Sequence, residues 1–255
     1  MKTTQIKQQS GFTLIELAIV LVIIGVLVGS FLATLGARID SSRRAEVQED
    51  LEIIKKAILG YAISSGGPYL PCPCTNDCDI DTANPAGMED RDAAAGTCTA
   101  DAAAGYLGYL PWGTLGLKPS DSWNTLYSYW VDPAFSDDGT GAGSVFDLAD
   151  AGTGQIRTRN PDGSATPLVA NNVVAVVFTH GKNAYGGLSV DGVARPAIPA
   201  GNVDEADNAD TNSAFISRTP SEAGSTTAGG EFDDIVFWIS DYEIKARMVD
   251  AGLLP

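Results

Sequence analysis

The stretch from Phe12 to Gly36 constrains this chain more than any other part of the sequence, because its 25 residues contain a single charge, Glu16. As a helix rising about 1.5 Å per residue it would extend for about 37 Å, and the hydrocarbon core of a bilayer is about 30 Å thick. Apolar residues occur on all sides of such a helix, which is typical of a helix covered by lipid or by other helices. The sequence therefore predicts a helix that can span a membrane.

Glu16 is the unusual residue of this stretch. A carboxylate inside a membrane helix costs about 2.5 to 3.5 kcal/mol on insertion scales, and such groups usually have a partner and a function. The residues three or four positions away, which are its neighbours on a helix, are not basic: Phe12, Thr13, Ile19 and Val20. We therefore expect a partner from elsewhere. Cleavage after Gly11 would create one, because Phe12 would then carry an α-amine that is positive at neutral pH.

The residues on either side of Gly11 resemble a known signature. The polar segment KQQSG ends at Gly11 and is followed by FTLIEL, which begins at Phe12. This arrangement resembles the N-terminal signature of type IV pilins and type II secretion pseudopilins. The resemblance implies that a prepilin peptidase removes residues 1–11 as a leader and that Phe12 becomes N-methylated. It also implies that Glu16 neutralises the α-amine of a neighbouring subunit during assembly.

Two other classes of apolar segment are alternatives to this interpretation, an ordinary membrane anchor and a secretory signal peptide. A signal peptide has an apolar region of about 7 to 15 residues followed by a cleavage site of small residues. The apolar run here is longer, and a signal peptide gives no reason for Glu16.

The helix is predicted to continue beyond the apolar run. No proline occurs between Phe12 and Gly67, and the sequence Gly-Gly-Pro at residues 66–68 is a stop signal. Many type IV pilins carry a proline midway along this helix, so the chain departs from them here. Apolar residues recur on one helical face, which we expect to pack on the rest of the protein: Val47, Leu51, Ile54, Ile58 and Tyr61.

Four segments follow from these signals. We expect a leader at residues 1–11, a membrane or filament-core helix at 12–36, its amphipathic continuation at 37–67, and a globular head at 68–255. The fold class is α+β and pilin-like, with the long helix packed on an antiparallel sheet that carries long loops, notably 136–154 and 197–230. Strands are predicted where short β-branched or aromatic runs occur, at Leu126–Val131, Val173–Thr179 and Ile235–Ser240. Hairpins are predicted at Gln155–Val169 and Leu188–Ala194, and a last helix at Asp241–Ala251.

All four cysteines of the chain lie within 27 residues of the head: Cys72, Cys74, Cys78 and Cys98. An even number favours disulfides in an oxidising compartment, with three possible pairings. A bond between Cys72 and Cys74 would close a cramped ring, so the favoured pairing is Cys72–Cys98 with Cys74–Cys78. A zinc site is the alternative, but it requires two pairs with C-x-x-C-like spacing, and the sequence offers at most one.

The head is strongly acidic. Residues 68–255 contain nine basic and 26 acidic side chains, which argues against nucleic acid as a partner. Two groups of oxygen-bearing side chains are nonspecific Ca²⁺ candidates: Asp77, Asp79 and Asp81, and then Asp204, Glu205, Asp207, Asn208 and Asp210. Because neither group has the spacing of an EF-hand loop, we expect solvated acids and no cofactor. The pairs Asp137–Asp138 and Asp233–Asp234 are likewise expected to be surface acids that flank strands.

The sequence shows no pattern typical of an enzyme. The one histidine, His180, follows a predicted strand and is expected to be a surface turn residue. The G-x-S-x-G, H-E-x-x-H and phosphate-binding glycine motifs are missing. We therefore expect a protein without catalytic residues.

The function implied by the resemblance is that of a structural subunit of a type IV pilus-like filament. The expected partners are further copies of the chain, the prepilin peptidase, an inner-membrane assembly platform and, before assembly, the membrane itself. The expected location is the inner membrane with the head in the periplasm, and then an extracellular filament.

Two alternatives remain open at this point, a minor pseudopilin of a type II secretion system and a membrane-anchored binding or adhesin module. No cysteine follows Cys98, whereas many type IVa major pilins close a C-terminal loop with two cysteines. The chain is also much longer than the usual major pseudopilin.

Overall fold

The computed structural model describes residues 12–255 except 77, 81–85 and 100–104, and it leaves out the side chains of residues 30–35 and 37. The predicted leader with Gly11, and the calcium candidates Asp77 and Asp81, lie outside the described residues. The chain divides into two compact units, Met1–Glu46 and Val47–Pro255.

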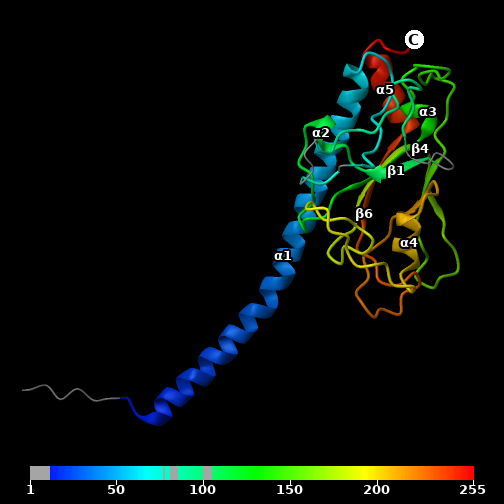
Figure 1. The fold of residues 1–255 in the computed structure, drawn as a ribbon. Helices are drawn as coiled ribbons and strands as arrows, with labels where there is room; N and C mark the ends of the chain where they lie inside the picture. Colours follow the sequence, from blue (N-terminus) through cyan, green and yellow to red (C-terminus); the bar gives the residue numbers. More distant parts are fainter. Residues whose placement is uncertain (1–11, 77, 81–85, 100–104) are drawn as a thin grey trace, which may run out of the picture. The chain divides into compact units, whose positions relative to one another are not determined.

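Helix α1 (Leu14–Ser64) belongs to both units and is the longest element of the chain (Figure 1). Its length reflects the absence of proline, which would remove a backbone hydrogen bond from a helix interior. The helix ends just before Gly66, whose φ of 91° lies in the left-handed region that glycine adopts without strain. The predicted long N-terminal helix and its stop signal are therefore confirmed.

In the first unit, the side chains of residues 12–29 are all exposed. The structure contains, over the residues that it describes, no helix with both the length and the apolarity needed to cross a membrane.

The second unit is built on a six-stranded sheet with the order β1-β2-β4-β3-β5, in which β6 also pairs with β4. The strands are β1 (Tyr106–Tyr109), β2 (Ser128–Val131), β3 (Gly154–Arg157), β4 (Leu168–Thr179), β5 (Ala214–Ile216) and β6 (Ile235–Ser240). The pairs are antiparallel except β3–β5, which is parallel. The expectation of an entirely antiparallel sheet was therefore wrong at one edge, because β5 is reached through the helix α4 (Val203–Ala209) rather than through a hairpin.

Strand β4 is the central strand, because it pairs with β2, β3 and β6. Its residues from Val173 to Thr179 are all buried, as expected of a strand that is covered on both faces. The strand starts at Leu168 rather than at Val173, because it forms the predicted hairpin with β3. In the turn of that hairpin the Gly163 amide donates to the Asn160 carbonyl.

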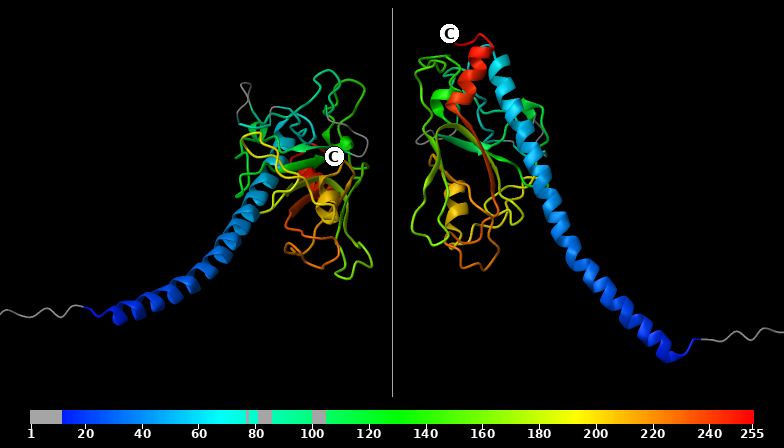
Figure 2. Two further views of the ribbon diagram at one scale, coloured as in Figure 1. Left: turned by 60° about the horizontal axis from the view of Figure 1, so that its bottom comes forward. Right: turned by 180° about the vertical axis from the view of Figure 1, so that it is seen from behind.

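The two faces of the sheet carry separate apolar clusters. One face packs against α1 and α5 (Asp241–Asp250), which lie side by side in Figure 2; members of this cluster include Val47, Leu51, Ile58, Tyr127, Tyr129, Val177, Ile244 and Met248. The opposite face carries Trp130, Ile156, Val176, Phe178 and Phe215. Each fully buried side chain of this size contributes about 1.5 to 3 kcal/mol. The predicted amphipathic face of α1 thus packs on the sheet.

Polar contacts also hold the second half of α1 on the sheet. Lys55 forms an ion pair with Glu243 of α5 at 2.7 Å. The Tyr127 hydroxyl donates to Asp50 at 3.0 Å, and the Tyr61 hydroxyl donates to Glu89 at 2.5 Å. These contacts fix the rotation of the helix about its axis, which apolar packing alone specifies less strictly.

The disulfides are Cys72–Cys98 and Cys74–Cys78, the pairing that the sequence favours. The cross-linked segment lies along β1, where Cys74 and Tyr109 exchange two backbone hydrogen bonds of 2.8 Å. Two short helices missed in the sequence follow, α2 (Trp112–Leu115) and α3 (Pro133–Ser136). The segment 197–230, expected to be a loop, contains α4 and β5.

Candidate functional site

The first turn of α1 holds the residues that the sequence singles out for assembly. The backbone amide of Thr13 donates to Oε2 of Glu16 at 2.9 Å, and the Thr13 hydroxyl donates to the same oxygen at 2.7 Å. In return, the Glu16 amide lies 3.4 Å from the Thr13 hydroxyl oxygen, to which it donates. This reciprocal arrangement is a capping box, in which Thr13 is the N-cap and Glu16 the third residue of the helix.

The capping box gives Glu16 a local, uncharged partner that the sequence analysis did not anticipate. The sequence did contain a signal for this cap, because Thr-x-x-Glu before an apolar run is a capping-box pattern. A negative charge in the first turn is also favoured by the helix dipole. The predicted pairing of Glu16 with the amine of another copy stays a prediction.

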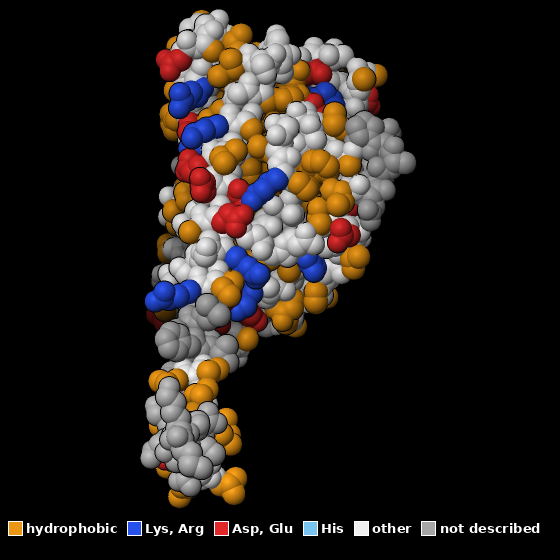
Figure 3. Space-filling model, turned by 90° about the vertical axis from the view of Figure 1, so that its left-hand side faces the viewer, with side chains coloured by type: hydrophobic (Ala, Val, Ile, Leu, Met, Phe, Trp, Pro, Cys, Tyr) orange, Lys and Arg blue, Asp and Glu red, His pale blue; other side chains and the backbone are white. Residues whose placement is uncertain are grey.

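The surface around the capping box is apolar. Phe12 is 84% exposed, and the large side chains that follow along α1 to Val28 are exposed as well. Figure 3 shows hydrophobic side chains exposed along this part of α1. Monomeric soluble proteins rarely expose a contiguous apolar surface of this extent, which marks an interaction with other proteins or with lipid.

The acidic residues of the head are not all solvated, contrary to expectation. Asp204 is fully buried and lies between two guanidinium groups, at 2.6 Å from Nε of Arg159 and 2.6 Å from Nε of Arg218. Of the first calcium group, Asp79 is half-buried. Asp204 is therefore already neutralised by cations of the chain itself.

Three further acids form a buried cluster: Glu205, Asp233 and Asp234. Their carboxylate oxygens lie within 4.8 Å of one another. The expectation that Asp233 and Asp234 are surface acids was wrong, because Glu205 and Asn208 of α4 lie against them. Sequence spacing gave no signal for this contact, since the two segments are far apart in the chain.

Asparagine amides hold this acidic cluster. The side chains of Asn183 and Asn202 donate to Glu205 at 2.7 and 3.0 Å, and Asn208 donates to Asp234 at 2.8 Å. Burial raises the pKa of Asp234 well above its ordinary value, and the nearby negative charges add to the effect. Burial likewise raises the pKa of Glu205. Three close carboxylates could together bind a hard cation such as Ca²⁺. In this structure, Glu205 and Asp234 instead accept hydrogen bonds from asparagine side-chain amides.

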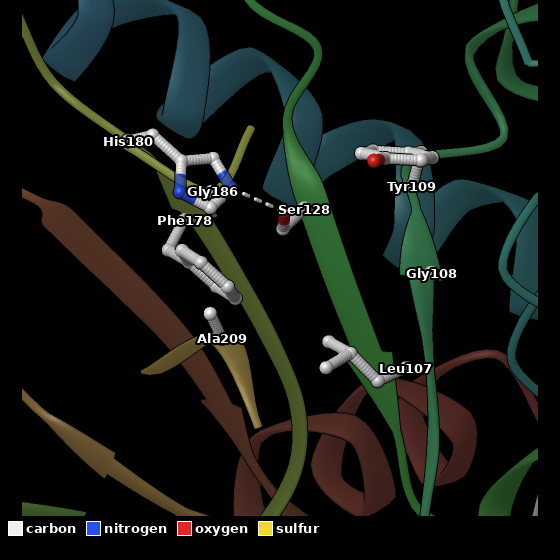
Figure 4. A pocket seen from close by; sticks show the side chains of 8 residues that line it. All are labelled: Leu107, Gly108, Tyr109, Ser128, Phe178, His180, Gly186 and Ala209. Atoms are coloured by element: carbon white, nitrogen blue, oxygen red, sulfur yellow. Dashed lines mark hydrogen bonds between the residues drawn. The ribbon is translucent and has the colours of Figure 1, made fainter. Parts of the chain in front are cut away.

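His180 is buried, with 3% of its surface exposed, so the expectation of a surface turn residue was wrong. Its position two residues after Phe178 places both side chains on the same face of β4, a signal that the sequence did contain. Ring nitrogen Nε2 lies 2.9 Å from the hydroxyl of Ser128, which is also buried (Figure 4). Burial lowers the pKa of His180 to about 4, so the ring is neutral at physiological pH.

Comparison with known families identifies the N-terminal segment. Residues 6–32 match the family described as the prokaryotic N-terminal methylation motif. No curated protein and no solved structure shows significant similarity to the chain. The match contains the proposed cleavage position, Phe12 and the capping box.

Proposed function

We propose that this chain, a precursor that carries the prepilin signature of type IV pilins and pseudopilins, is a structural subunit of a pilus-like filament. The observation that carries the proposal is the exposed apolar surface over residues 12–29, which contains no charged side chain but Glu16 and overlaps the matched methylation motif at residues 6–32. Such a surface requires a covering of lipid before assembly and of neighbouring helices afterwards.

The apolar part of α1 supplies most of the association energy in this proposal. Removal from water stabilises by about 25 cal/mol per Å² of apolar surface. For subunits that leave a bilayer the gain is smaller, because packing between helices replaces contact with lipid.

Glu16 has a second role in this proposal, beyond its cap. Removal of residues 1–11 leaves a positive α-amine on Phe12, and in the filament this amine pairs with Glu16 of an adjacent copy. To form the pair, the carboxylate either gives up the Thr13 hydrogen bonds or shares an oxygen between the two partners. Glu16 therefore acts as a helix cap in a single subunit and as a charge partner in the filament.

The remaining elements of the proposal follow from this assembly route. The prepilin peptidase and an inner-membrane assembly platform are the expected partners. The head lies in the periplasm before assembly and on the filament surface after it, where an oxidising compartment allows both disulfides. We propose no catalytic role for the chain.

Two substitutions of Glu16 test the proposal. Glu16→Ala removes both the charge and the cap, whereas Glu16→Gln removes the charge but keeps a side chain that completes a capping box. If the charge is needed for assembly, both variants insert into the membrane and neither enters filaments. The readout is electron microscopy of sheared surface filaments, with membrane fractionation as the control for insertion.

Assembly of Glu16→Gln at the wild-type level would contradict the charge pairing and leave the cap as the function of Glu16.

Mass spectrometry of the purified subunit should show an N-methylated Phe12 as the first residue. An unprocessed chain that is anchored in the membrane, with no filament, would favour the anchored binding module instead. If the Glu16 variants stop the secretion of exported proteins but leave surface filaments unchanged, the minor pseudopilin would be favoured.

A further inference from the structure

The second unit contains a pocket of about 160 Å³ that has no part in the proposed assembly. It lies on the sheet face opposite to α1 and is lined by residues of β1, β2, β4, the loop after β4, and α4 (Figure 4): Leu107, Gly108, Tyr109, Ser128, Phe178, His180, Gly186 and Ala209. The strand register explains why these residues meet. Tyr109 is opposite Ser128, and Ser128 is opposite Phe178, so the three form one row across the sheet.

The polar centre of the pocket is the pair Ser128 and His180. Nε2 of the neutral His180 ring lies 2.9 Å from the Ser128 hydroxyl, and the tautomer of the ring decides which of the two donates. A hydroxyl can both donate and accept, so in either tautomer Ser128 keeps hydrogen-bonding capacity for a ligand in the pocket.

The loop that carries His180 and Gly186 is held in place by backbone hydrogen bonds to a buried carboxylate. Asp233 accepts hydrogen bonds from the backbone amides of Lys182 and Asn183 at 2.9 and 3.0 Å. Ala184 has a φ of 56°, a left-handed conformation that residues other than glycine rarely adopt. Strain of this kind persists only where surrounding contacts enforce it, and it is frequent at ligand sites. The pocket wall is therefore preorganised.

Size and charge restrict what the pocket can bind. An engineered cavity of roughly 150 Å³ takes up benzene, so a pocket of about 160 Å³ accommodates one six-membered ring. None of the described residues that line it carries a charge at neutral pH, and the surrounding head is acidic. An anion therefore finds no cationic partner in the pocket. The rings of Tyr109 and Phe178 offer apolar contact, and the hydroxyls of Ser128 and Tyr109 offer hydrogen bonds.

We propose that this pocket binds a single uncharged pyranose ring, that is, one monosaccharide unit. A pyranose has an apolar C–H face for the aromatic side chains and hydroxyl groups that can donate to or accept from the Ser128 hydroxyl. For a ligand of about a dozen heavy atoms, the dissociation constant should be on the order of millimolar. The proposal does not depend on filament assembly, since every residue involved belongs to the unit Val47–Pro255.

The test is saturation-transfer NMR on the full chain in a sugar-free zwitterionic detergent, with D-glucose, D-galactose, D-mannose and phenol as probes. At least one sugar should receive saturation from the protein in a concentration-dependent way. Ala209→Leu fills the pocket from α4 and should weaken that binding at least tenfold, whereas the matched change Ala206→Leu, at an exposed position of the same helix, should not. Ser128→Ala should weaken binding about fivefold, the equivalent of one hydrogen bond.

A second filling variant, Leu107→Trp on β1, repeats the test from the opposite wall if Ala209→Leu does not fold, as judged by circular dichroism. Absence of saturation transfer to all three sugars would overturn the proposal. So would unchanged sugar binding in a folded filling variant, or binding of phenol alone.

Discussion

Single residues show where environment overrides composition in this protein. Asp234 occurs in a chain with 32 acidic residues, so the sequence gives no reason to separate it from the others. The fold buries it beside Glu205 and Asp233 and raises its pKa. Its protonated form is therefore favoured in the folded state more than in the unfolded chain, where the pKa of an aspartate is about 3.9.

The first prediction concerns the pH dependence that this raised pKa creates. Protonated Asp234 stabilises the fold, so its contribution is complete below the unfolded pKa and is lost as the pH rises through the folded pKa. Asp234→Asn, which keeps an acceptor for Asn208, should leave the melting temperature similar at pH 4. At pH 8 it should raise that temperature by about 2 to 4 °C, as expected for about 1 kcal/mol. Thermal unfolding followed by circular dichroism between these pH values measures the effect.

The control for this prediction is Asp191→Asn, at an exposed turn position outside the helices. It removes the same formal charge without relieving burial, so it should shift the melting temperature little at either pH. Equal effects of the two substitutions at pH 8 would mean that overall charge, and not the cluster, sets the dependence.

At the scale of elements, local patterns predicted α1, β6 and the last helix well. The spacing of Val47, Leu51, Ile54 and Ile58 on α1 identified the face that the structure buries. In β6 the predicted and observed bounds agree, and Ser240 caps α5 by accepting a hydrogen bond from the Glu243 amide. These features are indicated by residues that lie close together in the sequence, so a local pattern is enough to predict them.

Elements that depend on distant contacts were not predicted. Strand β1 is short and contains Gly108, and it exists because it pairs with β2 on one side and with Cys74 on the other. Strand β5 has three residues and is stabilised by its parallel pairing with β3. Neither strand has enough residues for a recognisable alternation. The acidic cluster likewise depends on a contact between segments that are far apart in the chain.

The second prediction tests how α1 is held on the sheet. Ile58→Ala removes a fully buried side chain and should lower the free energy of unfolding by about 2 to 5 kcal/mol. Ile53→Ala is the matched control, because Ile53 lies on the same helix with 48% of its surface exposed. Its effect should stay within about 0.5 kcal/mol. Urea unfolding of the full chain in detergent measures both, and a similar loss for the two variants would contradict the assignment of the buried face.

The whole molecule combines an apolar helix with a head that has 26 acidic and nine basic residues over 68–255. Surfaces of this charge repel one another at close range, and the repulsion is screened by salt over a Debye length of about 30 Å at 0.01 M and about 10 Å at 0.1 M. In the proposed filament, attraction between helices and repulsion between heads therefore oppose each other.

The third prediction follows from this opposition. Raising NaCl from 0.01 to 0.15 M should increase the fraction of subunits in filaments, measured by sedimentation of the assembled material. An equal osmolality of sucrose, which does not screen charge, is the control. A decrease of assembly with added salt would show that ionic attraction between heads, rather than repulsion, dominates.

The backbone pairing of Cys74 with Tyr109 has a further consequence for the proposed filament, in which many copies of the chain would lie close together. An open outer strand invites the same strand of an adjacent copy to join it, and ordered arrays can then clump irreversibly. Here an isolated bridge to Cys74 occupies part of the outer edge of β1, and two disulfides hold the bridging segment in position. In the proposed filament this edge of one head is therefore less open to pairing with the same edge of another copy.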